Sequence, residues 1–372
     1  AHLLICQKGS RFTFSHNFKD LLLGQLLNKL EGREPGDFVL RKRSKGTNGE
    51  ADIWPDFSIN DYLKENPANK VVVSKIEKQI EEIPVSLSVE RFDKIFYETH
   101  VEDFQKMKNL HSAFFPSQIP DSVFISKMKD PLYRELYNEV QKKYSNFNPV
   151  QEELEEVFRR IKFYFPNQKT PSKVTTLISE MDYQNKVIYT DSLLLISLDL
   201  YLGKEHKFYE FPDYFKQTFQ RSQIMPDVVS DFSTRVIAQP REKTFLDQMI
   251  YFGKEMYIKD LILPTYEDFD KIGYSKEQQI WCEENEGEIW RYFIEDNILY
   301  DSDTKLVQRF IAPAPFSKFY LEIDNESPGR TGVWIGWQIV RSFMKNNEVS
   351  LADFLAMDAK EIFTRSKYKP KK

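Results

Sequence analysis

How this chain packs is decided by one stretch near its C-terminus, Ser327-Pro328-Gly329-Arg330-Thr331-Gly332-Val333-Trp334-Ile335-Gly336-Trp337-Gln338-Ile339-Val340. Apolar residues recur there at helical spacing, which predicts a helix over 331–345. Gly332 and Gly336 lie one turn apart within it. A glycine costs about 1 kcal/mol inside a helix, so two of them predict that another backbone approaches this face closely. A pocket at the same place is the alternative interpretation.

Helical periodicity also dominates the rest of the chain. Apolar residues have helical spacing over 101–165, where prolines separate the segments. Ser275 with Gln278, and Ser350 with Asp353, have the three-residue spacing of helix N-termini. Beyond residue 209 we expect helices over 212–221, 226–237, 244–262, 276–297, 331–345, 351–356 and 359–364.

The clearest β region covers residues 173–202. Val174–Met181 and Lys186–Tyr189 flank a turn, and the apolar run 193–198 follows. This order predicts a three-stranded antiparallel meander whose last strand is buried on both faces. The alternating segment 85–89 predicts one further half-buried strand. The fold class is therefore α+β, predominantly α-helical with a small antiparallel sheet.

The composition of the 372-residue chain is that of an ordinary globular protein, with 41% hydrophobic and 29% charged residues. The 52 basic and 57 acidic residues leave no basic excess, which argues against nucleic acid as a partner. Two cysteines, Cys6 and Cys282, exclude a disulfide-dense scaffold and a multi-cysteine metal cage. No run approaches the roughly 20 apolar residues of a membrane-spanning helix.

A shift in composition near residue 75 predicts two parts, residues 1–74 and residues 75–372. Six of the 13 glycines fall within the first 49 residues. The first part is an N-terminal extension or small separate unit, in which residues 18–30 predict a short amphipathic helix. Cys6 follows Leu3, Leu4 and Ile5, so it is a candidate for lipidation, with an ordinary buried thiol as the alternative.

The common catalytic motifs are missing from the sequence. It contains neither a glycine-rich phosphate loop nor the G-x-S-x-G turn of a serine hydrolase. A zinc peptidase needs two histidines on one helical face, and no two of the five histidines lie three or four residues apart. We therefore expect no cofactor, no bound metal and no catalytic residue.

From about residue 78 onward the chain resembles the GldB family of gliding-motility lipoproteins of Bacteroidetes. The matching segments occur in the order expected for the family and cover about four fifths of the chain. They are Glu90–Lys94, Leu198–Lys204 with Phe208-Tyr209, Met249–Tyr257, Trp281-Cys282, Glu284–Glu286, Ile289-Trp290, Ala314–Phe316, Ser327–Val340 and Ser366–Pro370.

The resemblance implies a degenerate scaffold of the zincin-peptidase type, since the family is distantly similar to predicted zinc peptidases. The places expected for the metal ligands read Met225-Pro226-Asp227-Val228-Val229-Ser230 and Tyr251-Phe252-Gly253-Lys254. The first lacks the histidines, and in the second Phe252 replaces the acid. The resemblance further implies a non-enzymatic lipoprotein of the cell envelope, membrane-associated and facing the periplasm. Its partners would be other proteins of the gliding and type IX secretion machinery. Our candidate functional surface comprises Gly253, Lys254, Tyr257, Arg330, Gly332, Trp334, Gly336 and Trp337.

Two other functions remain open at this point. The chain could be a metallopeptidase-like hydrolase whose ligands are not recognised in the sequence. It could also be a glycan-binding module that uses Trp281, Trp290, Trp334 and Trp337.

The first testable prediction concerns the two parts of the chain. Limited proteolysis should cut between about Pro55 and Ser74 and leave a folded C-terminal fragment, because linkers between folded units are the preferred sites of cleavage. Mass spectrometry of the resistant fragment locates the cut. If a chain that starts at Ser74 fails to fold, the boundary is wrong.

Overall fold

In the computed structural model, residues 76–240, 242–322 and 324–371 are described with their side chains, and four strands before residue 76 are described by their backbone alone. The chain divides into two compact units, Ala1–Pro84 and Val85–Lys372. The composition places the division after residue 74 instead, and the proteolysis experiment addresses that boundary directly.

The first unit contains a four-stranded antiparallel sheet with the strand order β2-β1-β3-β4. Cys6 lies in β1, opposite Thr13 of β2 and Val39 of β3. Its side chain, and the helix predicted over 18–30, lie outside the described residues. The strands are β1 (His2–Gln7), β2 (Thr13–Asn17), β3 (Phe38–Lys42) and β4 (Asp56–Ser58).

The second unit is α+β and mainly helical, as predicted, with a small sheet of order β5-β6-β8-β7. Its strands are β5 (Ser88–Arg91), β6 (Lys173–Leu177), β7 (Val187–Tyr189) and β8 (Leu193–Ser197).

This sheet is mixed, so the predicted antiparallel meander is wrong. Strand β6 is parallel to β5 and β8, and only the pair β7–β8 is antiparallel. The segment after β6 does turn at Tyr183–Asn185, but it crosses to the far edge of the sheet instead of returning beside β6. The physical reason is burial: Leu194 and Ile196 of β8 are fully buried, so the most apolar strand takes an interior position between β6 and β7.

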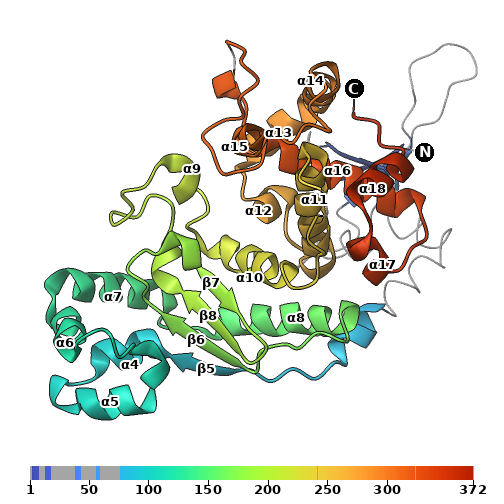
Figure 1. Ribbon diagram of the computed structural model, residues 1–372. Coiled ribbons are helices and arrows are strands. Elements are labelled where there is room, and N and C mark those ends of the chain that lie inside the picture. Colours follow the sequence, from blue (N-terminus) through green and yellow to red (C-terminus); the bar gives the residue numbers. More distant parts are fainter. Residues whose placement is uncertain are drawn as a thin grey trace, which may run out of the picture. The chain divides into compact units, whose positions relative to one another are not determined.

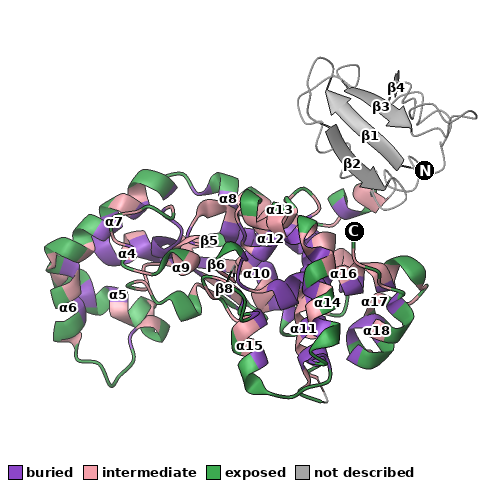
Figure 2. Cartoon of the chain, turned by 90° about the horizontal axis from the view of Figure 1, so that it is seen from above, coloured by how far each residue is buried: buried purple, intermediate pink, exposed green. Residues whose placement is uncertain are grey.

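The main core joins this sheet to long helices (Figure 1). Helix α8 (Asn148–Tyr164) contributes Leu154, Phe158 and Ile161 to the same buried cluster as β8. Buried residues are concentrated in α10 (Ile224–Ser233), α11 (Phe245–Ile262) and α16 (Thr331–Asn346), which are largely purple in Figure 2. The remaining helices of this region are α9 (Asp213–Lys216), α12 (Asp268–Ile272), α13 (Lys276–Glu284), α14 (Glu286–Glu295), α15 (Thr304–Phe310), α17 (Leu351–Ala356) and α18 (Ala359–Ser366).

A second, smaller core lies among four helices next to β5 (Figure 1). It is rich in aromatic rings, of which Phe92, Phe115 and Phe124 are buried. Phe115 meets Phe124 edge to face at 4.9 Å, the geometry that aromatic pairs favour. The helices are α4 (Phe92–Glu98), α5 (Phe104–Leu110), α6 (Asp121–Lys129) and α7 (Pro131–Tyr144).

Helix ends follow the sequence signals where capping residues are present. The predicted N-termini at Ser275 and Ser350 are confirmed, and Ser275 forms a reciprocal capping box with Gln278. The single helix predicted over 276–297 is two helices, which meet at Asn285. The Trp281 carbonyl oxygen accepts hydrogen bonds from both the backbone N–H of Asn285 at 3.0 Å and its side-chain amide at 2.8 Å, which closes the end of α13.

A buried carboxylate holds a strained loop after β6. Glu180 and Met181 have positive φ angles of 59° and 65°, a region that residues other than glycine rarely adopt. The fully buried Asp199 accepts hydrogen bonds from the backbone N–H groups of Ser179 at 2.9 Å and Met181 at 2.7 Å. Burial raises the pKa of Asp199 to about 6, although these hydrogen bonds favour the charged form.

The second testable prediction follows from that pKa, which is raised from 3.8 to about 6 on folding. The protonated form is favoured in the folded state, so Asp199 stabilises the protein most at acidic pH and this contribution is lost as the pH rises through 6. Between pH 4 and 7, the free energy of unfolding of the wild type should therefore fall by about 2 kcal/mol relative to that of Asp199→Asn. Urea unfolding of both proteins at the two pH values measures the difference; a difference that does not change with pH contradicts the assignment.

Candidate functional site

The two long helices α11 and α16 touch through their backbones. A Cβ atom added to Gly336 would overlap the carbonyl group of Met249, and one added to Gly253 would overlap the carbonyl group of Gly336. At Gly332 an added Cβ would lie 2.9 Å from the Phe310 carbonyl oxygen. The close backbone approach predicted from the two glycines is therefore confirmed.

The structure brings the predicted site residues together, but in the interior of the unit. Six of the eight are buried: Gly253, Lys254, Gly332, Trp334, Gly336 and Trp337. Tyr257 and Arg330 are half-buried. The group is thus interior and not an exposed surface, because the glycines draw α11 and α16 together and the neighbouring side chains fill the space around the crossing. A functional role for these residues remains a prediction.

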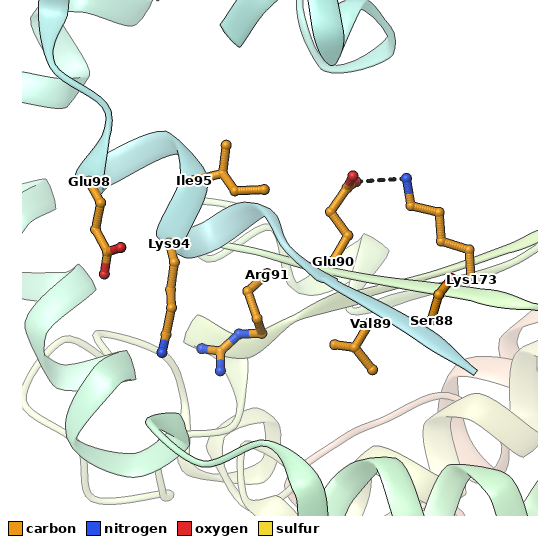
Figure 3. Close-up of a pocket in the computed structure, with 8 residues that line it drawn as sticks. All are labelled: Ser88, Val89, Glu90, Arg91, Lys94, Ile95, Glu98 and Lys173. Carbon is orange, nitrogen blue, oxygen red and sulfur yellow. Dashed lines mark ion pairs between the residues drawn. The ribbon is translucent and has the colours of Figure 1, made fainter. Parts of the chain in front are cut away.

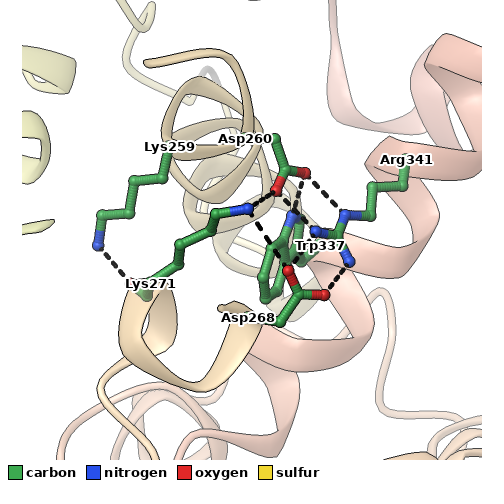
Figure 4. Close-up of polar contacts among 6 residues, drawn as sticks. All are labelled: Lys259, Asp260, Asp268, Lys271, Trp337 and Arg341. Carbon is green, nitrogen blue, oxygen red and sulfur yellow. Dashed lines mark hydrogen bonds and ion pairs between the residues drawn. The ribbon is translucent and has the colours of Figure 1, made fainter. Parts of the chain in front are cut away.

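Beside this crossing lies a network of charged side chains between α11, α12 and α16 (Figure 4). Asp260 accepts hydrogen bonds from the Trp337 indole at 2.9 Å, from Arg341 at 2.7 and 2.6 Å, and from Lys271 at 2.9 Å. Asp268 binds the same guanidinium at 2.7 and 3.0 Å. The Arg341 guanidinium also stacks over the Trp337 ring at 3.8 Å. Two carboxylates thus meet two cations, and the network is neutral as a whole.

The electrostatics of this network favour its charged form. Burial opposes ionisation of Asp260 and Asp268, but the guanidinium of Arg341 and the ammonium of Lys271 more than offset it, so the pKa of each carboxyl lies below its usual value. The same carboxylates raise the pKa of Arg341 against the effect of burial. A carboxylate held ionised by two cations is a weak proton acceptor, so the network is suited to joining helices and not to acid–base chemistry.

Asp260, Asp268 and Lys271 are not among the site residues predicted from the sequence. A signal was present for Asp260, since it lies within a mostly apolar helix in which Met256 and Ile258 are also buried. A charged residue at such a place predicts a charged partner. Its partner Arg341 is more than 70 residues away in the chain, so the sequence alone could not name it.

Two further buried lysines support neighbouring segments. Lys254 donates to the carbonyl oxygens of Leu355 at 3.0 Å and Met357 at 2.7 Å, at the C-terminal end of α17. Burial lowers the pKa of Lys254 to about 8. Lys259 donates to the Lys271 carbonyl oxygen at 3.0 Å and pairs with Glu255 at 3.1 Å. These lysines satisfy carbonyl groups at turns and helix ends, so their positions have a structural explanation.

The two places where a peptidase would carry its metal ligands lie on α10 and α11, which pack against each other. Ser230 of α10 donates to Glu255 of α11 at 2.7 Å. Although burial opposes its ionisation, the ammonium of Lys259 lowers the pKa of Glu255. Among residues 76–240, 242–322 and 324–371, no group of three or more His, Cys, Asp or Glu side chains is placed to hold a metal ion.

Arg330 precedes α16 in the left-handed conformation, with φ 63°. Its guanidinium donates to the Ile272 carbonyl oxygen at 2.6 Å. Glu255 pairs with Lys259 at 3.1 Å, and Glu286 accepts a hydrogen bond from the Tyr368 hydroxyl at 2.9 Å. The arginine therefore joins the entry of α16 to the end of α12 through a backbone contact.

The four tryptophans of the glycan-binding alternative do not form one platform. Trp334 and Trp337 are 1% and 0% exposed and meet edge to face at 5.9 Å. Trp290 is half-buried against Phe363 and Tyr368. A sugar needs an open aromatic face, which the first two rings lack.

An open depression of about 630 Å³ runs along the edge strand β5 (Figure 3). Its charged residues are engaged: Glu90 pairs with Lys173 at 2.9 Å, and Arg91 binds Asp93 at 2.9 and 2.7 Å. Val89 and Ile95 supply its apolar part. The depression offers contact area for another molecule but no nucleophile beside a base. Its remaining lining residues are Ser88, Lys94 and Glu98.

A comparison with known protein families shows to which family this chain belongs. The model of the family described as gliding motility protein GldB matches residues 73–370. The chain belongs to the GldB family. The resemblance seen in the sequence is thereby confirmed, and as a member of a lipoprotein family of gliding motility the chain is a protein of the cell envelope. No curated protein and no solved structure matches the chain. In the part that the structure describes, no helix has both the length and the apolar character needed to cross a membrane.

The third testable prediction concerns the crossing of α11 and α16 in this GldB-family chain. Gly336→Ala should lower the free energy of unfolding by about 1–3 kcal/mol and Gly336→Leu by more, because each added atom must push the α11 backbone away. The matched control is Glu288→Leu at an exposed helical position, which should change stability by less than about 1 kcal/mol. Urea unfolding of the three variants gives the comparison; equal stability of Gly336→Leu and the wild type would refute backbone contact.

Proposed function

We propose that this protein is a non-catalytic component of the gliding and type IX secretion machinery that faces the periplasm and acts through contacts with other proteins. The observation that supports the proposal best is the pairing of interior charges. Asp260 and Asp268 are neutralised by Lys271 and Arg341 at hydrogen-bonding distances, and they hold α11, α12 and α16 together. These four interior charges therefore have structural partners.

The chemistry of four interior carboxyl groups and of the Cys282 thiol agrees with this proposal. A general base needs a pKa near neutrality and access to substrate. Glu255, Asp260 and Asp268 have lowered pKa values, and Asp199, whose pKa is about 6, is fully buried against a loop. Burial also raises the pKa of the Cys282 thiol, which makes it a poor nucleophile.

An anchored protein that does not catalyse a reaction must act by binding. The exposed features of the described part that can serve this purpose are the depression along β5 and large apolar side chains on loops and helix ends. The eight residues predicted as a functional surface lie in the interior of the unit. The proposal therefore places the contacts with other proteins at these exposed features.

The fourth testable prediction separates this proposal from the metallopeptidase-like alternative. Deleting the gene for this chain in its own bacterium should abolish gliding and reduce secretion of type IX cargo, and the wild-type gene should restore both. The purified protein should hold no stoichiometric zinc and should not cleave peptides, as measured by elemental analysis and a peptide-library assay. Normal gliding and secretion in the deletion strain contradict the proposal, as does one tightly bound zinc per chain with peptidase activity.

A further inference from the structure

The loop between α15 and α16 exposes two neighbouring apolar side chains. Tyr320 is 73% exposed and Leu321 is 56% exposed. Large apolar side chains at the end of a loop cost solubility and are therefore informative when they occur together. Their surroundings show whether this part of the loop is fixed or free to collapse onto the protein.

The base of the loop is closed by buried hydrogen bonds. The backbone N–H of Ser317 donates to the Pro328 carbonyl oxygen at 3.0 Å and to the Ser327 hydroxyl at 3.1 Å. The Ser327 hydroxyl donates to the Ser317 carbonyl oxygen at 3.2 Å, and the Thr331 hydroxyl reaches the Ser317 hydroxyl at 2.8 Å. Thus Ser327, Pro328 and Thr331, which belong to the stretch that enters α16, also fix the two ends of this loop.

The apex of the loop is held by one carboxylate. Asp324 accepts hydrogen bonds from the backbone N–H groups of Phe319 at 3.1 Å, Tyr320 at 2.8 Å and Leu321 at 3.2 Å. Tyr320 has a φ of 65°, a conformation that is unfavourable for an aromatic residue and persists only where the surroundings impose it. The carboxylate therefore maintains a strained backbone that points two apolar side chains toward solvent.

The loop is also anchored to α14 and α15. Phe319 is 8% exposed, and its ring lies 5.1 Å from the rings of Tyr292 and Phe310. Arg309 donates to the Lys318 carbonyl oxygen at 2.7 Å, and its guanidinium lies 4.4 Å from the Tyr320 ring. Tyr320 thus has a fixed position before any partner binds, which reduces the entropy lost on association.

The charges next to the exposed pair indicate what kind of surface it fits. Glu322 and Glu326 are exposed, and with Asp324 they make three acidic residues from 318 to 326, against Lys318 in the same segment and Arg309 of α15, whose guanidinium lies over the Tyr320 ring. An acidic border is repelled by anionic lipid headgroups, so it disfavours insertion into a membrane. It complements a protein pocket whose rim is basic.

We propose that Tyr320 and Leu321 form a preformed docking tip that inserts into an apolar pocket with a basic rim on a partner protein. This inference rests on the proposed function, because it names the place at which the protein contacts the machinery. The carboxylate of Asp324 acts as a positioning group, and Glu322 and Glu326 pair with the rim of the pocket.

The experiment uses the full chain in its own bacterium. In one strain Leu321 is replaced by the photo-cross-linking amino acid p-benzoylphenylalanine. In a second strain the chain carries the tip variant, Tyr320→Asn with Leu321→Ser; asparagine tolerates the left-handed conformation and keeps the loop geometry. A third strain carries the photo-cross-linker together with the charge-reversal variant, Glu322→Lys with Glu326→Lys. The matched control is Leu110→Ser, which removes a side chain of similar exposure, 72%, at the end of α5.

We expect one discrete cross-link from position 321, mapped by mass spectrometry to a partner segment next to lysine or arginine residues. The charge-reversal variant should reduce its yield at least about tenfold. The tip variant should abolish gliding at unchanged abundance and melting temperature, whereas Leu110→Ser should glide normally.

Three outcomes overturn the inference. If the tip variant glides like the wild type while the gene deletion abolishes gliding, the tip is not the contact, and the proposed function stands. If the deletion strain itself glides, the proposed function is wrong, and the inference that rests on it is wrong as well. If purified protein sediments with phosphatidylethanolamine–phosphatidylglycerol vesicles and the tip variant does not, the partner is a membrane and not a protein.

Discussion

The contact between the backbones of α11 and α16 is the constraint on which the second unit depends. Gly253 and Gly336 have no side chains to separate the helices, so the Met249 carbonyl group lies against the position of Gly336. Such a contact gives little hydrophobic stabilisation of its own, since it buries almost no side-chain area. Its effect is geometric, because it fixes the separation at which every flanking side chain must pack.

The charge network follows from that geometry. With the helices so close, Trp337 and Arg341 of α16 reach Asp260 of α11, and the same arginine draws in Asp268 of α12. Buried ion pairs add little net stability compared with apolar packing, but removing one partner leaves an unpaired charge. The network therefore specifies which helices are neighbours more than it increases the free energy of unfolding.

Sequence reasoning succeeded where a physical signal was local and failed where it was distant. The two glycines of α16 and the capping serine of α13 were recognised because their effects act within one or two turns. The strand order could not be derived, because it depends on whether β7 or β8 takes the interior position beside β6. The predicted functional surface proved to be interior because close helix packing and ligand binding select similar residues, glycine and tryptophan among them. The loop at Tyr320 has no periodicity, and its fixed shape depends on the hydrogen bonds to Asp324, so the sequence gives no signal for the docking tip that we propose.

The parallel pairing of β5 with β6 has a consequence for how the chain folds. Ser88 lies beside Lys173, and between them come α4 to α8, so the two strands meet only after about 85 residues have been arranged. Contacts between segments far apart in the chain are slow to form, because loop closure must be completed before they contribute. Strands β6 and β8 are much closer in sequence and can pair first. During synthesis, the edge strand β5 is made before β6, so its backbone N–H and C=O groups stay unpaired until β6 has formed. Strand β5 is therefore the segment most in need of protection from wrong pairing until the sheet is complete.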